Sequence, residues 1–465
     1  MNKKTRLFLL GLCSICFLIG APLLIFYSMG FRIDFEKKKI VATGGIYIRT
    51  YPLADEIVLD SQILGKPSVF SNAFFIQGLL PRQYEILIKK RGYFDYKKTV
   101  LVKEKEVTKL ENIILFKKLL ALRKIFENID YLSVSPDKQH VLAFTYQDKK
   151  VKVTYFPITD PSSSHLFSLS PNLKINNVIW NHNNKASLVE AQTENKVLLY
   201  YLFKNVNGSF MLNPLSQFPK NCQKILFSPE NDEILYQKKD ALYSYSLVSN
   251  REEKILEEKI LDYQIYKNKI LILSTEGEVS LFDPFLKSKE NISNQKLIIK
   301  PNKKYQIFVA SSYIFFKEDD SLFLFNPSQK IFEILKSPSS LLLVLSSPDE
   351  KKIIYCTNER IDIYFSSDFQ GPKRYYTLFQ GKDIKNCQWL NNNYLLFTSE
   401  NNVIILETEL PNGKINPINL SEAFFIPNSQ EEIPIKSPLL FFHPSSAKIY
   451  LLTEKILLES EKILP

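Results

Sequence analysis

The chain has 465 residues, of which 45% are hydrophobic, 13% aromatic and 23% charged, and its formal net charge is +11 at pH 7. This composition excludes a disordered chain, and the length predicts two or more domains with a large core. The charge is spread over mixed runs such as Arg251 to Lys254 (REEK), and no zinc finger, basic helix or aromatic RNA motif is present. Nucleic acid is therefore not expected as a partner.

The N-terminal segment predicts a membrane-spanning helix. Leu7 to Met29 contains no charged residue, and about 23 helical residues extend about 35 Å, enough to cross a bilayer core. The alternative is a cleaved signal peptide, but its apolar region is shorter, and here Pro22 follows the small pair Gly20-Ala21. We expect residues 1–6 as a cytoplasmic tail, residues 7–29 as a single transmembrane helix of the cell membrane, and the bulk of the chain as extracytoplasmic.

Residues 41–117 show short runs in which apolar and polar residues alternate, separated by proline and glycine. A period of two indicates half-buried strands, so we expect a small antiparallel β-sandwich. The residues expected in its core are Ile46, Ile48, Ile57, Leu59, Ile86, Ile88, Val100 and Val102.

The turns of this segment resemble those of PEGA domains. The resemblance rests on the order and spacing of Pro52, Asp60, Gly65, Pro67, Pro81, Tyr84, Gly92 and Tyr93. Two departures are that Pro52 to Asp55 (PLAD) stands where the family has Pro-Glu-Gly-Ala, and that Arg82 replaces a turn glycine. The resemblance implies a surface or envelope module and no reaction. We expect the prolines and glycines to set turn geometry, and Tyr93 to pack its ring on the sandwich.

Residues 118–128 are expected to form a connector or a strand that closes the next domain. Leu120 to Phe126 (LALRKIF) resembles Lys330 to Leu335 (KIFEIL), which is expected to be the outer strand of a later repeat. A short helix is the alternative, since Leu119, Leu120, Leu122 and Phe126 also fit one helical face. We favour the strand, because the last repeat of the chain provides only three strands and a fourth would cover its exposed edge.

Residues 129–465 contain a loose repeat of an apolar strand, a polar turn and a second apolar strand. The turns recur at intervals of about 43 to 53 residues, which is the spacing of four-stranded propeller blades. Two weaker units lie around Tyr266 to Lys269 and Pro301 to Lys304. Counting them predicts a β-propeller of seven or eight blades, with eight favoured. The turn positions are Pro136, Asp137, Asn181, Pro229, Pro348, Asp349, Asn391 and Pro444.

The Ser-Pro-Asp turns resemble those of the TolB-type and WD-repeat-like propellers of bacterial envelopes. Gly-His and Trp-Asp signatures are absent and glycine is scarce, so the resemblance implies a fold class and nothing finer. The predicted fold is thus mainly β, with an N-terminal transmembrane helix, a small PEGA sandwich and a propeller.

Motifs for catalysis or for binding a cofactor or metal are not found. The sequence lacks a P-loop, a Gly-x-Ser-x-Gly elbow and a His-Glu-x-x-His pair. Cys222, Cys356 and Cys387 are expected to be small buried apolar residues without disulfides. We therefore expect no cofactor and no metal.

These features favour a non-catalytic envelope protein whose ectodomain binds an envelope protein or a cell-wall glycan, or acts as a scaffold. One alternative is a propeller enzyme that acts on glycans with carboxylates in its central channel. The other is a purely structural spacer at the cell surface. The partner and the oligomeric state stay open at this point.

Overall fold

The computed structural model describes residues 3–34, 38–65, 67, 73–206, 208–229, 233–319, 321–326, 330–335, 341–365, 375–409, 417–427 and 435–465. The fold is mainly β, with 59% strand and 6% helix. The chain divides into two compact units. The first holds Met1–Leu120, Ile405–Phe425 and Ile463–Pro465, and the second holds Ala121–Ile404 and Ile426–Lys462.

The first unit begins with helix α1 (Lys3–Ser28). Its segment Leu9–Ser28 has a mean hydropathy of 2.5, and none of it is buried in the protein. Length and composition fit a membrane anchor or a signal sequence. A two-stranded hairpin of β1 (Phe31–Asp34) and β2 (Lys39–Ala42) follows directly.

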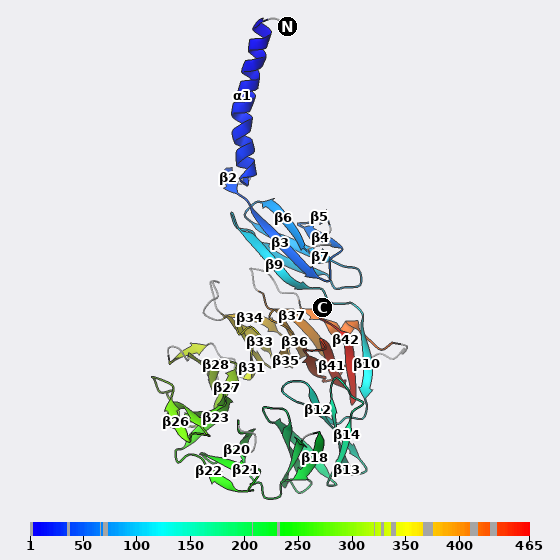
Figure 1. Ribbon diagram of the computed structural model, residues 1–465, viewed down its shortest axis with the longest axis vertical. Coiled ribbons are helices and arrows are strands. Elements are labelled where there is room, and N and C mark those ends of the chain that lie inside the picture. Colours follow the sequence, from blue (N-terminus) through cyan, green and yellow to red (C-terminus); the bar gives the residue numbers. More distant parts are fainter. Residues whose placement is uncertain are drawn as a thin grey trace. The chain divides into compact units, whose positions relative to one another are not determined.

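Two sheets enclose the core of the first unit (Figure 1). The eight core residues predicted from the alternation all lie in this core, which confirms that part of the prediction. One sheet has the order β6 (Ala73–Leu79), β3 (Gly44–Tyr51), β9 (Val107–Ile114). The other has the order β5 (Gln62–Gly65), β4 (Glu56–Leu59), β7 (Gln83–Lys89), β8 (Tyr96–Leu101).

The expected all-antiparallel pairing is wrong for one strand pair. Strand β9 runs parallel to β3, with Ile46 opposite Thr108 and Ile48 opposite Leu110. Parallel neighbours need a long crossover connection, and here the chain passes through the other sheet between β3 and β9. The apolar alternation is the same for either direction of pairing, which is why the sequence pattern did not reveal it.

Eight further sheets follow in chain order among the described residues. Seven have four strands each, namely β11–β14, β15–β18, β19–β22, β23–β26, β27–β30, β31–β34 and β35–β38. The eighth has the order β39–β10–β42–β41–β40. We call these sheets blades 1 to 8.

The strands of blades 1 to 4 have the following bounds: β11 (Tyr131–Val134), β12 (His140–Gln147), β13 (Lys150–Pro157), β14 (His165–Leu169), β15 (Leu173–Trp180), β16 (Ala186–Thr193), β17 (Leu198–Val206), β18 (Ser209–Pro214), β19 (Gln223–Phe227), β20 (Glu233–Lys238), β21 (Ala241–Ser246), β22 (Glu252–Lys254), β23 (Ile260–Tyr266), β24 (Lys269–Ser274), β25 (Val279–Asp283) and β26 (Ser288–Asn291). Those of blades 5 to 8 are β27 (Tyr305–Ala310), β28 (Tyr313–Glu318), β29 (Ser321–Asn326), β30 (Ile331–Leu335), β31 (Leu341–Ser346), β32 (Lys352–Thr357), β33 (Arg360–Phe365), β34 (Tyr375–Gln380), β35 (Lys385–Trp389), β36 (Tyr394–Ser399), β37 (Asn402–Glu407), β38 (Ile418–Asn419), β39 (Phe424–Phe425), β10 (Leu120–Phe126), β40 (Leu439–His443), β41 (Lys448–Thr453) and β42 (Ile456–Lys462), with a short 3-10 helix η1 (Leu420–Ala423) before β39.

Apolar side chains join each blade to the next, so the blades form a ring. Blades 1 and 2 share one buried cluster, in which Tyr155 and Phe203 meet. Similar clusters join the next blades as far as blade 6, and the first strands of blades 6, 7 and 8 contact one another. Blade 8 packs on blade 1 through Phe441 and Tyr450 against Val141. The described residues therefore form a closed propeller of eight blades (Figure 1).

Strand β10 closes the ring. It pairs antiparallel with β42, with Leu122 opposite Ser460 and Lys124 opposite Leu458. The side chains of Leu120 and Leu122 are buried. Residues 118–128 thus contain the favoured closing strand rather than the helical alternative, and blade 8 combines strands from both ends of the repeat region.

Removal of β10 is expected to destabilise the whole ring. A shortened chain that begins at Ile129 should unfold with lower cooperativity and associate, because the edge of β42 becomes exposed. The matched control begins at Lys117 and retains β10. Calorimetry with light scattering compares them, and identical melting of the two chains would contradict a role for β10 in closure. In the full chain, Leu122→Ala should cost about 2–5 kcal/mol of unfolding free energy.

Candidate functional site

The eight predicted turn positions all lie between the first and second strands of their blades. Of the two weaker repeat units, Pro301 to Lys304 does not: it precedes β27, and the first turn of that blade is Ser311-Ser312. The eight residues found in such turns are Pro136, Asp137, Asn181, Pro229, Pro348, Asp349, Asn391 and Pro444.

A buried polar residue stands at one repeated position of these turns, the residue before the predicted proline in the Ser-Pro-Asp turns; the sequence pattern predicted the turn but not the burial of this residue. In blade 1, Ser135 Oγ accepts a hydrogen bond from His140 N at 2.9 Å, and Asp137 accepts one from Gln139 N at 3.0 Å. Asn181 Oδ1 accepts from Ala186 N at 3.0 Å. These side chains satisfy backbone donors that the turn leaves unpaired, so the repeated motif stabilises the turn. The equivalent residues are Ser135, Asn181, Ser228, Ser347 and His443, all buried; Ser347 and His443 also accept backbone hydrogen bonds, whereas Ser228 Oγ has no hydrogen-bond partner among the described residues.

The residues behind the PEGA resemblance also serve turn structure. Asp60 lies 2.7 Å from Arg82 and accepts a hydrogen bond from Glu85 N at 2.8 Å. The Arg82 guanidinium lies 4.0 Å from the centre of the Tyr84 ring. Arg82, the departure from the family pattern, thus joins two turns through its charge. Gly65 and Gly92 have positive φ, Tyr93 packs against the core, and Pro52, Pro67 and Pro81 lie in the connections that follow β3, β5 and β6.

Two of the three cysteines outside helix α1 are buried as expected, namely Cys356 and Cys387. Cys222 is only half-buried, and its Sγ donates to Pro219 O at 3.2 Å. It lies in the connection between β18 and β19 and packs against the apolar cluster that joins blades 2 and 3.

Asp262 is the most unusual charged residue of the ring centre, where the first strands of successive blades meet. It is the one carboxylate on the eight first strands, all of which are described. Asp262 is 4% exposed, and its Oδ1 lies 2.6 Å from Lys224 Nζ. Its Oδ2 accepts a hydrogen bond from Ile307 N at 2.6 Å. One side chain therefore links the first strands of blades 3, 4 and 5.

Burial raises the pKa of Asp262, and the Lys224 ammonium and the Ile307 N–H oppose this increase. Hydrolysis of a glycoside needs two carboxylates about 5–9.5 Å apart. On the first strands Asp262 has no such partner, and its oxygens are already occupied by Lys224 and Ile307. Sequence reasoning missed this residue. The available signal was a lone acidic residue within the apolar run ILDYQIY at 260–266.

A cavity of about 570 Å³ lies beside the ring-closing strand. Its lining includes Arg123 from β10, and Lys448 and Glu459 from blade 8. Glu459 is bound by Arg123 at 2.7 Å, Lys448 at 3.0 Å and the Tyr450 hydroxyl at 2.8 Å. Burial acts to raise the pKa of Glu459, but Lys448, Tyr450 and Arg123 outweigh it and the pKa is lowered. The buried carboxylate of this cavity is thus fully engaged in joining β10, β41 and β42.

The turn between β25 and β26 presents apolar side chains to solvent. Phe285 is 80% exposed and Leu286 is 67% exposed. Their backbone is held in place, because Asp283 Oδ1 accepts hydrogen bonds from Phe285 N at 3.0 Å and Leu286 N at 3.1 Å. The equivalent turn of blade 3 carries Val248, which is 78% exposed. We call Val248, Phe285 and Leu286 the apolar rim.

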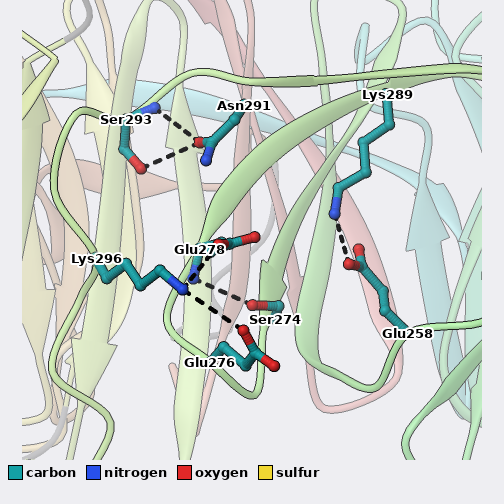
Figure 2. A network of polar contacts seen from close by, with 8 residues as sticks. All are labelled: Glu258, Ser274, Glu276, Glu278, Lys289, Asn291, Ser293 and Lys296. Atoms are coloured by element: carbon teal, nitrogen blue, oxygen red, sulfur yellow. Dashed lines mark hydrogen bonds and ion pairs between the residues drawn. The ribbon is translucent and has the colours of Figure 1, made fainter.

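Ion pairs connect the outer parts of blades 3 and 4 around this turn. Lys287 lies 3.3 Å from Glu253. Lys289 lies 2.5 Å from Glu258, a pair that Figure 2 shows. Figure 2 also shows Lys296 between Glu276 and Glu278, at 3.5 Å and 2.8 Å. Exposed pairs each contribute about 0–1 kcal/mol, so these contacts add little to the stability of the blades. Among the described residues no group of three or more His, Cys, Asp or Glu is placed to hold a metal ion.

Comparison with protein-family models finds no match to the chain, and no curated protein matches it. The PEGA resemblance therefore has no family match behind it. Three similar solved structures are the Dos1 propeller (TM-score 0.47, 11% identity, 73% of this chain and 94% of that chain), Kluyveromyces lactis Hsv2p (0.41, 10%, 63% and 97%) and the computationally designed Ika8 protein (0.44, 8%, 74% and 98%). Similarities this weak establish neither a shared fold nor a shared function. The propeller assignment rests instead on the order of the strands in each sheet and on the closure of the ring.

Loss of Lys224 should leave a buried charge without compensation. Lys224→Met is expected to cost about 3–5 kcal/mol at pH 7, as for other buried pairs from which one partner is removed. The pKa of Asp262 is raised in the folded state, so between the folded and unfolded pKa of this residue the folded variant binds more protons than the unfolded chain. The stability of the variant should therefore rise as the pH falls towards the pKa of aspartate in the unfolded chain.

The matched control is the double variant Lys224→Met/Asp262→Asn, which removes both charges and should recover most of the loss. Denaturant unfolding between pH 5 and pH 8 measures both proteins. A single variant as stable as the native protein across this range would show that the ion pair has no structural role.

Proposed function

We propose that the protein is a non-catalytic, membrane-anchored scaffold whose propeller binds a protein partner through the apolar rim. The observation that carries this proposal is the turn of Phe285 and Leu286, whose backbone is hydrogen-bonded to Asp283 while both side chains are largely exposed. Exposed apolar clusters with a polar border are typical of binding surfaces. Aromatic anchors held in advance in one conformation lose little entropy on binding.

The choice of binding over catalysis is supported by the ring centre. Asp262 is neutralised by Lys224 and buried, which disfavours the alternative of a glycan hydrolase with a carboxylate pair in the channel. The turn between β25 and β26 disfavours a purely structural spacer, because a spacer does not require the exposed apolar side chains of Phe285 and Leu286.

The membrane assignment is supported by the apolar helix. Leu9–Ser28 is long enough to span a bilayer, and the described residues of the protein bury none of it. We propose that it is retained as a single-pass anchor, with the N-terminus in the cytoplasm and the residues that follow the helix outside. We further propose that the small sandwich is a PEGA-type envelope module that separates the propeller from the membrane anchor along the chain, as its turn residues suggest.

The binding role of the apolar rim can be tested by photocrosslinking in intact cells. A benzoylphenylalanine introduced at Phe285 should give a defined protein adduct. Leu286→Asp in the same chain should reduce adduct formation about tenfold, since loss of a binding anchor costs about 1.4 kcal/mol or more.

The matched control carries the photocrosslinker at Ser163. This residue occupies the equivalent turn of blade 1 and is also exposed, but polar. Equal adducts at both positions, or adducts insensitive to Leu286→Asp, would contradict the proposal. An adduct released by glycan hydrolases and resistant to proteases would identify a glycan partner instead.

Topology and anchoring can be measured together. External protease should remove residues 30–465 from intact spheroplasts, and mass spectrometry of the untreated protein should find residues 1–29 retained. Full protection until lysis would overturn the extracytoplasmic assignment. A mature chain that begins near Pro22 would overturn the anchor.

A further inference from the structure

The β1–β2 hairpin is tied to the end of helix α1. Arg32 Nη1 donates a hydrogen bond to Tyr27 O at 2.8 Å, and the guanidinium lies 3.4 Å from the centre of the Tyr27 ring. Thr43, which follows β2, donates to Gly30 O through both its N at 2.8 Å and its Oγ1 at 2.7 Å. The Phe26 and Phe31 rings pack edge to face with centroids 5.5 Å apart. These contacts place the hairpin at the C-terminal end of the apolar helix.

One face of the hairpin is apolar and uncovered. Ile33 pairs directly with Ile40 across the two strands, so both side chains project from the same face. Ile33 is 55% exposed and Ile40 is 66% exposed. A two-stranded hairpin alone is marginally stable in water, and two exposed isoleucines at this position need a covering surface.

The charge of the hairpin indicates which surface covers it. Lys38 and Lys39 lie in and next to the turn of the hairpin, and both are exposed. Tyr27 and Arg32 at the base of the hairpin are the residue types that mark the boundary between bilayer and water. Lysines beside exposed isoleucines match a surface with anionic head groups above acyl chains.

We propose that the β1–β2 hairpin lies on the outer surface of the bilayer, with Ile33 and Ile40 inserted at the boundary of head groups and acyl chains and with Lys38 and Lys39 on anionic phosphates. This inference rests on the proposed membrane anchor and adds a second attachment to it. The hairpin then fixes the direction in which the chain leaves the membrane, because Thr43 and Arg32 bind it to the helix end.

Quenching by brominated lipids tests the proposal. The full chain is reconstituted in vesicles of phosphatidylcholine and phosphatidylglycerol, with single substitutions Leu18→Trp in the helix, Ile40→Trp in the hairpin, and Ile63→Trp as a control. Ile63 is as exposed as Ile40, at 70%, but belongs to the sandwich. The unsubstituted protein supplies the background from Trp180 and Trp389.

We expect bromine at the upper acyl positions to quench most of the tryptophan emission added by Ile40→Trp, and this emission should be shifted to the blue. Bromine near the ends of the acyl chains should quench the emission added by Leu18→Trp. The emission added by Ile63→Trp should not change. Lys38→Glu/Lys39→Glu should reduce quenching of Ile40→Trp, and the reduction should disappear in pure phosphatidylcholine.

The outcomes separate the inference from the anchor. Quenching of Leu18→Trp without quenching of Ile40→Trp would overturn the hairpin proposal and leave the anchor intact. A blue shift of Ile40→Trp without quenching would indicate cover by protein, which also overturns it. If Leu18→Trp is not quenched, the anchor fails and the hairpin proposal fails with it.

Discussion

Closure of the ring through β10 is the constraint on which the propeller depends. A four-stranded blade cannot bury both of its faces alone, so each blade is stable only between two neighbours. Seven blades obtain their strands from consecutive sequence, whereas blade 8 needs β10 from the opposite end of the repeat region. The pairing of β10 with β42 therefore covers the last edge and brings blade 8 against blade 1.

The ionic contacts of the ring follow from the same geometry. Glu459 receives Arg123 from β10 and Lys448 from β41, so its carboxylate lies at the point where the two ends of the repeat region meet. Asp262 has a similar place at the ring centre, where it connects three first strands. A buried carboxylate with cationic and backbone donors stabilises one arrangement of neighbouring strands, and it is not free to act as an acid or base.

The proposed binding surface lies on the outer turns. Antiparallel strands alternate in direction, so the turn after the third strand of a blade lies on the same side of the ring as the turn after the first. The first set is capped by buried polar residues such as Ser135 and Ser347. The second set differs between blades, with a polar turn around Ser163 in blade 1 and the apolar pair Phe285 and Leu286 in blade 4. Variation of this kind on a constant scaffold is what a binding surface requires.

The sequence by itself determined the elements whose signal is local. Period-two alternation identified the sandwich core, the uncharged run identified α1, and the spacing of the turns predicted seven or eight blades, because each of these patterns depends on residues close in the chain. The parallel pairing of β3 with β9, the ion pair of Asp262 with Lys224, and the exposure of Phe285 were decided only by the tertiary structure. Alternation does not encode strand direction, and a lone aspartate in an apolar strand does not identify its ion-pair partner. An apolar residue in a turn is expected from the sequence to be buried, and only the packing of the blades shows that it is exposed.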